Sequence, residues 1–208
     1  MIIVDVETTG HDPKKHSIVS IGAIDLEDPN KQFYIENQIF EGAEVFEGDP
    51  LVPDYKPALM INGFTKEQIK DKSKPKLNEA IESFLKWIES SKVKILAGHN
   101  PYFDMEFLKS SALRHNIKWN LGYSAIDLHT AVFLSYKQRG LVPPKLRSND
   151  CFNYVGLPQE PHPHNALTGA KMEAESFHRL IYGKPFLEEF KKYQVPDYLL
   201  KTIKEKIN

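Results

Sequence analysis

The first part of the chain has apolar segments of strand length separated by turn residues. Residues 2–6, 17–25 and 31–39 are rich in β-branched or aromatic side chains, a pattern typical of β-strands. The segment 40–61 is rich in Gly, Pro and acidic residues, so we predict a long connection there. The opening pattern therefore predicts an antiparallel meander of three strands.

Beyond residue 61 the apolar positions follow a helical period, interrupted by two short apolar runs. The clearest example is 77–90, where Leu77, Ile81, Phe84, Leu85 and Ile88 share one helical face. We predict helices over 65–70, 77–90, 100–116, 128–140, 146–155 and 164–182, strands over 93–98 and 123–127, and a hinge or loop at 140–145. Thr65 and Asn100 are residue types that cap helix N-termini. Three strands followed by alternating helices and strands predict an α/β fold with a mixed five-stranded sheet flanked by helices.

Composition narrows the setting of the protein. The 208 residues are enough for one hydrophobic core, so we expect one domain over 1–182 and a lysine-rich helical tail over 183–208, packed on the domain or extending from it. No apolar run approaches the roughly 18–20 residues of a membrane span. The single cysteine, Cys151, excludes an intramolecular disulfide and fits a reducing compartment, so we expect an inert buried thiol in a cytoplasmic protein without a membrane partner. The net charge of −1 means that nucleic acid would need a local basic patch or metal ions.

Three separated segments carry candidate chemistry. Asp5 and Glu7 are two residues apart in a strand, so both side chains leave the same face. An Asp-x-Glu pair is expected about once by chance in a chain of this size, and acids at a frayed strand end explain it equally well. Asp104 follows a strand in the second turn of a helix, where the helix dipole alone favours an acid. His164 begins the last long helix; by itself it is also explained as a solvated loop histidine.

Six motifs occur in an order that changes this interpretation. They are VDVETTG (4–10), IVSIGAI (18–24), NGFT (62–65), AGHNPYFDMEFL (97–108), AIDL (125–128) and PHNAL (163–167). With these motifs the chain resembles the DnaQ-like 3′–5′ exonucleases of the histidine (DEDDh) subtype, which include ribonuclease T, oligoribonuclease and bacterial proofreading subunits. The resemblance covers about residues 1–182 and implies a ribonuclease-H-like fold.

The resemblance also implies a function and a set of roles. It implies a two-metal 3′–5′ exonuclease that uses Mg²⁺ or Mn²⁺ and releases nucleoside 5′-monophosphates from single-stranded DNA or RNA ends. Asp5 would bridge both ions, Glu7 would hold the ion beside the nucleophile, Asp104 would hold the other ion, and His164 would be the general base. The expected substrate-binding residues are Thr8, Thr9, Asn100 and Phe103, with Asp127 in a supporting role. A DNA polymerase or a second copy of the chain is a further expected partner.

One position departs from the family pattern. The family has an aspartate ligand five residues after the histidine, and here that position is Gly169. Glu173, four residues later on the same helical face, is one candidate to reach the metal instead. A second explanation is a site that holds one ion well and the other weakly. A third is a nucleic-acid-binding or polymerase-associated module that has lost catalysis. The sequence leaves these alternatives open, and it does not tell a natural glycine from an introduced one.

The remaining conspicuous side chains have simpler interpretations. Trp87, Phe107 and Trp119 lie at helical spacings typical of a core, whereas Phe103 is a candidate to stack on a base. Lys137, Arg139, Lys145 and Arg147 either contact phosphates or form a solvated basic loop. The tail lysines 184, 191, 192, 201, 204 and 206 are predicted to form one solvated helical face.

Overall fold

A computed structural model describes residues 1–49, 51 and 56–204 of the chain, and a single mixed sheet organises it. The strands are β1 (Ile2–Thr8), β2 (Ile18–Asp25), β3 (Asp28–Glu36), β4 (Leu96–Gly98) and β5 (Ala125–Asp127), in the order β3-β2-β1-β4-β5. The first three are antiparallel neighbours, and β4 and β5 run parallel to β1. The predicted mixed five-stranded sheet is confirmed, although β3 begins earlier, at Asp28, and β4 and β5 are shorter than predicted.

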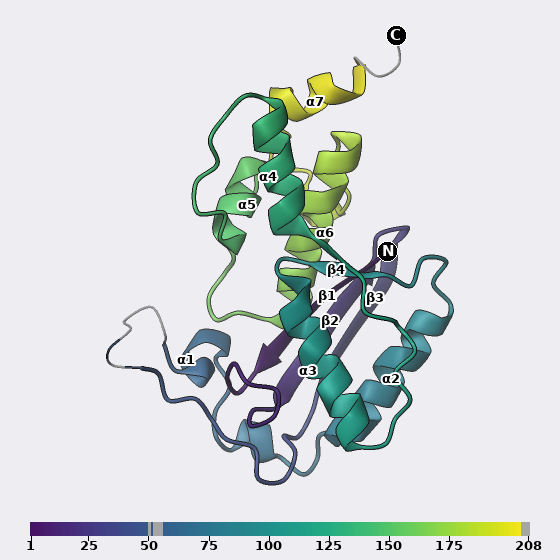
Figure 1. The fold of residues 1–208 in the computed structure, drawn as a ribbon, viewed down its shortest axis with the longest axis vertical. Coiled ribbons are helices and arrows are strands. Elements are labelled where there is room, and N and C mark those ends of the chain that lie inside the picture. The colour runs from purple at the N-terminus through teal and green to yellow at the C-terminus, as the bar shows by residue number, and fades with distance from the viewer. Residues whose placement is uncertain (50, 52–55, 205–208) are drawn as a thin grey trace.

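Helices cover both faces of the sheet and continue beyond one end of it (Figure 1). Helices α2 (Leu77–Glu89) and α3 (Pro101–Arg114) pack on one face, and α6 (Ala166–Tyr182) packs on the other. Helices α4 (Leu128–Gln138), α5 (Ser148–Tyr154) and α7 (Asp197–Lys204) gather around the far half of α6, at the top of the view. None of the helices in these described ranges is both long and apolar enough to cross a bilayer.

Some of the predicted elements need correction. The segment predicted as a connection over 40–61 contains most of a short helix, α1 (Ala58–Asn62), and its positions 50 and 52–55 lie outside the described residues. The helix predicted over 65–70 is a single 3₁₀ turn, Gln68–Lys70, although the Thr65 hydroxyl accepts a hydrogen bond from the Gln68 amide at 3.2 Å. A second 3₁₀ turn occupies Glu188–Phe190.

The alternation of side chains along β1 directs the acids toward α6. Ile2, Val4 and Val6 belong to the core beneath α2 and α3, whereas Ile3 belongs to the core beneath α6. Because successive strand residues point to opposite faces, the two acidic residues that follow Ile3 at odd positions also face α6. The strand pattern alone therefore places two carboxyl groups against the helix that carries Gly169.

Helix α6 can approach the sheet closely because β2 has a glycine, Gly22, beneath Ala166, the first residue of α6. A Cβ added at Gly22 would lie 2.1 Å from the carbonyl carbon of Ala166. Any side chain at this position would push the start of α6 away from β2. The aromatic residues predicted as core are confirmed as such, since Phe107 is buried with α2 and α3 while Trp87 and Trp119 pack against the same cluster. The thiol of Cys151 is buried in the other cluster, and burial raises its pKa to about 12.

The tail is packed against the helical half of the molecule. Leu187, Phe190, Val195 and Leu199 are part of the core that surrounds α6. The guanidinium of Arg139, one of the basic residues predicted in the loop region, lies 3.7 Å from the ring centre of Tyr198 in α7. Position 206 of the predicted lysine face lies outside the described residues, as do the side chains at 201 and 204.

A buried ion pair anchors this tail. The fully buried Arg179 donates from Nε to Glu175 Oε1 at 2.7 Å and from its terminal nitrogens to the carbonyl oxygens of Val155, Phe190 and Tyr193, each at 3.0 Å. Glu175 Oε2 accepts from the backbone amides that open the tail at Phe186 and Leu187. The pair therefore joins the end of α6 to the backbone on both sides of it.

Replacing Arg179 should strongly destabilise the fold. We expect Arg179→Ala to lower the free energy of unfolding by about 3–5 kcal/mol, because a buried carboxylate and several buried carbonyl groups lose their donor. Urea unfolding followed by circular dichroism measures the change. Lys66→Ala is the control, since its pair with Glu47 is exposed on both sides and such surface pairs contribute little to stability. Equal losses in the two variants would contradict this role.

Candidate active site

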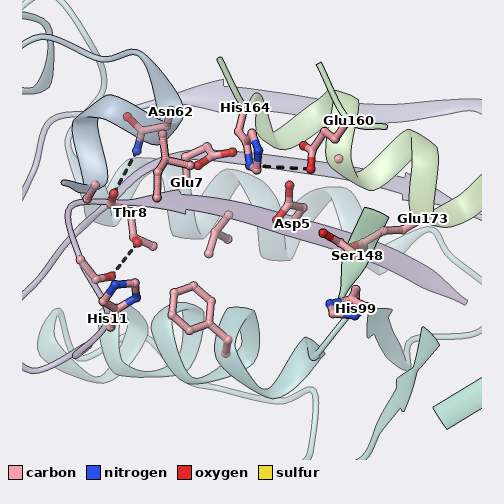
Figure 2. Close-up of a pocket in the computed structure, with 16 residues that line it drawn as sticks. Asp5, Glu7, Thr8, His11, Asn62, His99, Ser148, Glu160, His164 and Glu173 are labelled. Carbon is pink, nitrogen blue, oxygen red and sulfur yellow. Dashed lines mark hydrogen bonds and ion pairs between the residues drawn. The ribbon is translucent and has the colours of Figure 1, made fainter. Parts of the chain in front are cut away.

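A cavity of about 230 Å³ opens at the C-terminal end of β1 (Figure 2). Its walls come from β1 and the turn after it, α1, the start of α3, the first residue of α5, the loop before α6, and α6 itself. Asp5, Glu7, Glu160, His164 and Glu173 all line it. Segments from both ends of the chain therefore meet at one point.

Asp104 lies directly behind this cavity. Its Oδ1 accepts the backbone N–H of Val6 at 2.9 Å. The Val6 amide is available because β4 pairs only with Ile2 and Ile3 of β1, so the strand has no neighbour on that side further along. Asp104 is buried but does not line the cavity in this structure.

Five acidic side chains meet here, and their burial and mutual repulsion disfavour the ionised form; they are Asp5, Glu7, Asp104, Glu160 and Glu173. Burial raises the pKa of Asp5 to about 7 and, with repulsion from Asp5, that of Glu160 to about 8. Burial, followed by repulsion from Asp5, also raises the pKa of Glu7, Asp104 and Glu173 well above the usual carboxyl range. A site with this much potential negative charge favours the binding of cations.

The histidine faces the same cavity. His164 Nδ1 lies 3.7 Å from Glu160 Oε2, the contact drawn as a dashed line in Figure 2. Burial, together with the neighbouring His162, lowers the pKa of His164. The imidazole is therefore neutral at neutral pH, which is the form that can accept a proton.

The short helix α1 fixes the loop that carries this histidine. The backbone N–H of His164 donates to Ile61 O at 2.9 Å, and Asn62 Nδ2 donates to Thr8 O at 3.0 Å. Gly63 has φ +74°, and a Cβ there would lie 2.7 Å from Cβ of Pro163. Helix α1 thus connects the end of β1 to the loop before α6. Helix α6 then begins at Ala166, after an Asn165 cap, rather than at His164 as predicted.

The predicted substrate-binding residues divide into two groups. Thr8 and the half-buried Phe103 line the cavity, and the Thr8 hydroxyl donates to Gly10 O at 2.7 Å. Thr9 lies outside it: the residue is fully buried, its N–H donates to Ser17 O, and its carbonyl accepts from Phe46 N–H. These backbone groups are bonded within the protein, and the expected role of the backbone around Thr8 and Thr9 in substrate binding stays a prediction.

Asn100 also lies outside the cavity and is exposed. Asn100 is the N-cap residue of α3, as predicted, but it has φ +57° and its side chain makes no capping hydrogen bond. Its backbone N–H instead donates to Asp127 Oδ1 at 3.0 Å, and the Asp127 carboxylate also accepts from His129 and Thr130 at the start of α4. Asp127 therefore orders the strand ends beside the site.

The sequence analysis missed Glu160 and the residues that support it. Glu160 lies in a proline-rich segment that reads as an ordinary loop, and its spacing from His164 matches no motif. Its backbone N–H donates to Asn149 Oδ1 at 2.8 Å, so α5 fixes its position. Glu173, the residue predicted to compensate for Gly169, does line the cavity.

The donor set fits hard divalent cations, which prefer carboxylate oxygens. Glu160 Oε1 and Glu173 Oε2 are buried atoms without a hydrogen-bond partner in the part of the chain that the structure describes, which is costly unless a ligand satisfies them. No group of three or more His, Cys, Asp or Glu side chains within 1–49, 51 and 56–204 is arranged as it stands to hold an ion. Asp104 bonds to the Val6 amide and Asp5 points toward Gly169, so binding requires rotation of these side chains.

Comparison with known proteins identifies the family. Residues 2–177 match the family model described as Exonuclease, of the ribonuclease T type, and the chain belongs to this family. It is 29% identical over 188 residues to the 3′-5′ DNA exonuclease Cap18 of Escherichia coli, covering 86% of this chain and 90% of the relative. It is 31% identical over 190 residues to DNA polymerase III subunit epsilon of Rickettsia felis, covering 88% and 74%. Ribonuclease T of Hahella chejuensis is 29% identical over 190 residues, covering 86% and 82%.

Solved structures agree on the fold. The nuclease domain of 3′hExo, a DEDDh family member bound to rAMP, matches with a TM-score of 0.65 at 15% identity, covering 94% of each chain. Escherichia coli exonuclease I in complex with a dT13 oligonucleotide matches with a TM-score of 0.62 at 15% identity, covering 86% of this chain and 40% of that one. The predicted DnaQ-like resemblance and the ribonuclease-H-like fold are confirmed.

The raised carboxyl pKa values predict how stability depends on pH. Between about pH 4, where unfolded carboxyls ionise, and the folded pKa of Asp5 at about 7, the folded protein holds protons that the unfolded chain has released. This contribution to the free energy of unfolding therefore falls as pH rises. Asp5→Asn removes it, so the variant should gain stability relative to wild type from pH 4 to 7.

Thermal melts in EDTA at several pH values measure this difference, and comparing the two proteins cancels the titration of the histidines. A difference in melting temperature that does not change with pH would contradict the expectation.

Proposed function

We propose that the chain is a metal-dependent 3′–5′ exonuclease that hydrolyses single-stranded DNA or RNA ends to nucleoside 5′-monophosphates, using two Mg²⁺ or Mn²⁺ ions. One observation carries the proposal: Asp5, Glu7 and His164 line one cavity, with Asp104 directly behind it. The family match over residues 2–177 supports the reaction class. The polymerase subunit, ribonuclease and DNA exonuclease among the relatives support nucleic acid as the substrate.

The carboxyl groups would hold the cations in this mechanism. Asp5, Glu7 and Asp104 are the proposed ligands, with Asp5 between the other two. Bound divalent cations supply a nucleophilic water at neutral pH and stabilise the negative charge of the leaving oxygen. The free energy that burial and mutual repulsion cost the ionised carboxylates would be offset when they neutralise positive charge.

His164 would then act as the general base. Its ring is neutral near pH 7 because burial lowers its pKa, so it can take a proton from the attacking water. Glu160 Oε2, at 3.7 Å from Nδ1, stabilises the imidazolium that results. The backbone bond from His164 to Ile61 holds the loop while the side chain moves the proton.

We propose that the cavity binds a chain end. The Asn62–Thr8 hydrogen bond and the close approach of Gly63 to Pro163 join the wall on the side of α1. Phe103 also lines the cavity, and its proposed role is to stack on a terminal base. Such stacking and backbone contacts are largely independent of sequence.

Gly169 supports a second candidate function. Position 169 lacks the family's third-motif carboxylate, so the chain is alternatively a binding module, associated with a polymerase or with a second copy of itself, on the same fold. The relationship to a polymerase III subunit favours a polymerase as that partner. Hydrolysis separates the two functions directly.

The test is a labelled single-stranded oligonucleotide, as DNA and as RNA, incubated with Mg²⁺ or Mn²⁺. We expect a 5′-labelled strand to shorten stepwise from its 3′ end with release of nucleoside 5′-monophosphate. His164→Ala should lower kcat by about 10²–10⁴-fold, because it removes the proton acceptor. His115→Ala is the control, since His115 is the C-cap residue of α3 and does not line the cavity.

The alternative makes a different prediction for the same assay. A protein that binds the oligonucleotide but cleaves neither substrate with either ion is a binding module.

A further inference from the structure

The space beside Gly169 is occupied by carboxylate oxygens from other parts of the chain. A Cβ at this position would lie 2.0 Å from Asp5 Oδ2 and 3.3 Å from Glu160 Oε1. An acidic side chain at 169 would therefore project into space that Asp5 and Glu160 already share. Glycine at 169 and glutamate at 160 are spatially complementary.

We propose that Glu160 supplies the carboxylate that position 169 lacks, and that its Oε1 binds the divalent cation held by Asp5 and Glu7. This inference rests on the proposed function, since it assigns a ligand of the same site. It assigns the role to the loop before α6 rather than to α6 itself.

The state of the Glu160 side chain supports a ligand role. Glu160 lines the cavity with only 8% of the residue exposed, and its buried Oε1 has no hydrogen-bond partner among the described residues. The bond from its backbone N–H to Asn149 Oδ1 holds the residue in place from α5. Its other oxygen, Oε2, faces His164, which leaves Oε1 available for a ligand.

Glu160 and Glu173 differ in the groups that surround their carboxylates. Glu7 is repelled by Asp5, by Glu160 and by Asp104, and Glu160 is repelled by Asp5. Glu173 is repelled first by Asp5, then by Asp104 and last by Glu160.

The contacts of Glu173 agree with this arrangement. Its Oε2 lies 2.9 Å from where a Cβ of Gly98 would be, at the end of β4 near the start of α3. In Figure 2, Glu160 lies above Asp5 and projects toward His164, while Glu173 comes from α6. Glu173 therefore lies toward the end of β4, whereas Glu160 lies beside His164 and position 169.

The experiment is a Mn²⁺ titration of the full chain without substrate, by calorimetry and by electron paramagnetic resonance of free Mn²⁺. We expect wild type to bind two ions. Glu160→Gln, which keeps the shape of the side chain, should weaken one of them by about 10- to 100-fold or more, because even residues behind metal ligands contribute this much. Glu82→Gln is the matched control, since Glu82 is exposed on α2 and should leave both affinities unchanged.

A rescue variant makes the test specific. Glu160→Ala alone should lose the ion as Glu160→Gln does. In Glu160→Ala combined with Gly169→Asp, the truncated residue leaves room for the new carboxylate once the end of the Asp5 side chain turns aside, and the second ion should bind again. Restored binding also shows that the single variant lost a ligand and not its fold. Unchanged Mn²⁺ binding in Glu160→Gln, or loss of the same ion only in Glu173→Gln, would overturn the assignment.

The Mn²⁺ titration and the nuclease assay test the two proposals independently. Two ions in wild type and one in Glu160→Gln, without hydrolysis of any oligonucleotide, would support the ligand role of Glu160 and overturn the exonuclease proposal. Hydrolysis by wild type, with two ions still bound tightly by Glu160→Gln, would support the exonuclease and overturn the role of Glu160 as a ligand.

Discussion

Five carboxyl groups crowded at the end of one strand are the constraint around which this molecule is organised. Removing a carboxylate from water is costly, and placing several of them together adds repulsion. The fold holds them there because each is fixed by a different element: Asp5 and Glu7 by β1, Asp104 by α3, Glu160 by the loop after α5, and Glu173 by α6. A protein that only needed a stable core would replace such groups with apolar ones.

Sequence patterns predicted those features that depend on residues close together in the chain. The strand period placed Asp5 and Glu7 on one face, and the ordered motifs identified the family and the sheet. Glu160 escaped this reasoning because its position depends on Asn149 and on the fold of a proline-rich loop, neither of which leaves a periodic signal. The burial of Thr9 could not be predicted for a related reason, since the partners of its backbone, Ser17 and Phe46, are distant in sequence.

Absent side chains shape the site as much as present ones do. Without a Cβ at Gly22, α6 lies close against β2, and without a Cβ at Gly169, the Asp5 carboxylate lies against the helix itself. The absence of a Cβ at Gly63 likewise lets Pro163 lie close to the backbone there. Each glycine costs conformational entropy on folding, and in return backbone segments approach within distances that no other residue allows.

The guanidinium of Arg179 ties the C-terminal end of α6 to the residues that follow the helix. The helix begins just after His164 and ends where this one side chain holds carbonyl groups from Phe190 and Tyr193. A polypeptide cut after Tyr182 would remove these two acceptors and leave the buried cation with Glu175 and the carbonyl of Val155. The end of α6 would then tilt or fray to hydrate the charge, and the same helix carries Gly169 and Glu173. Residues 186–193, remote from the cavity, thereby help to hold in place the helix that forms one of its walls.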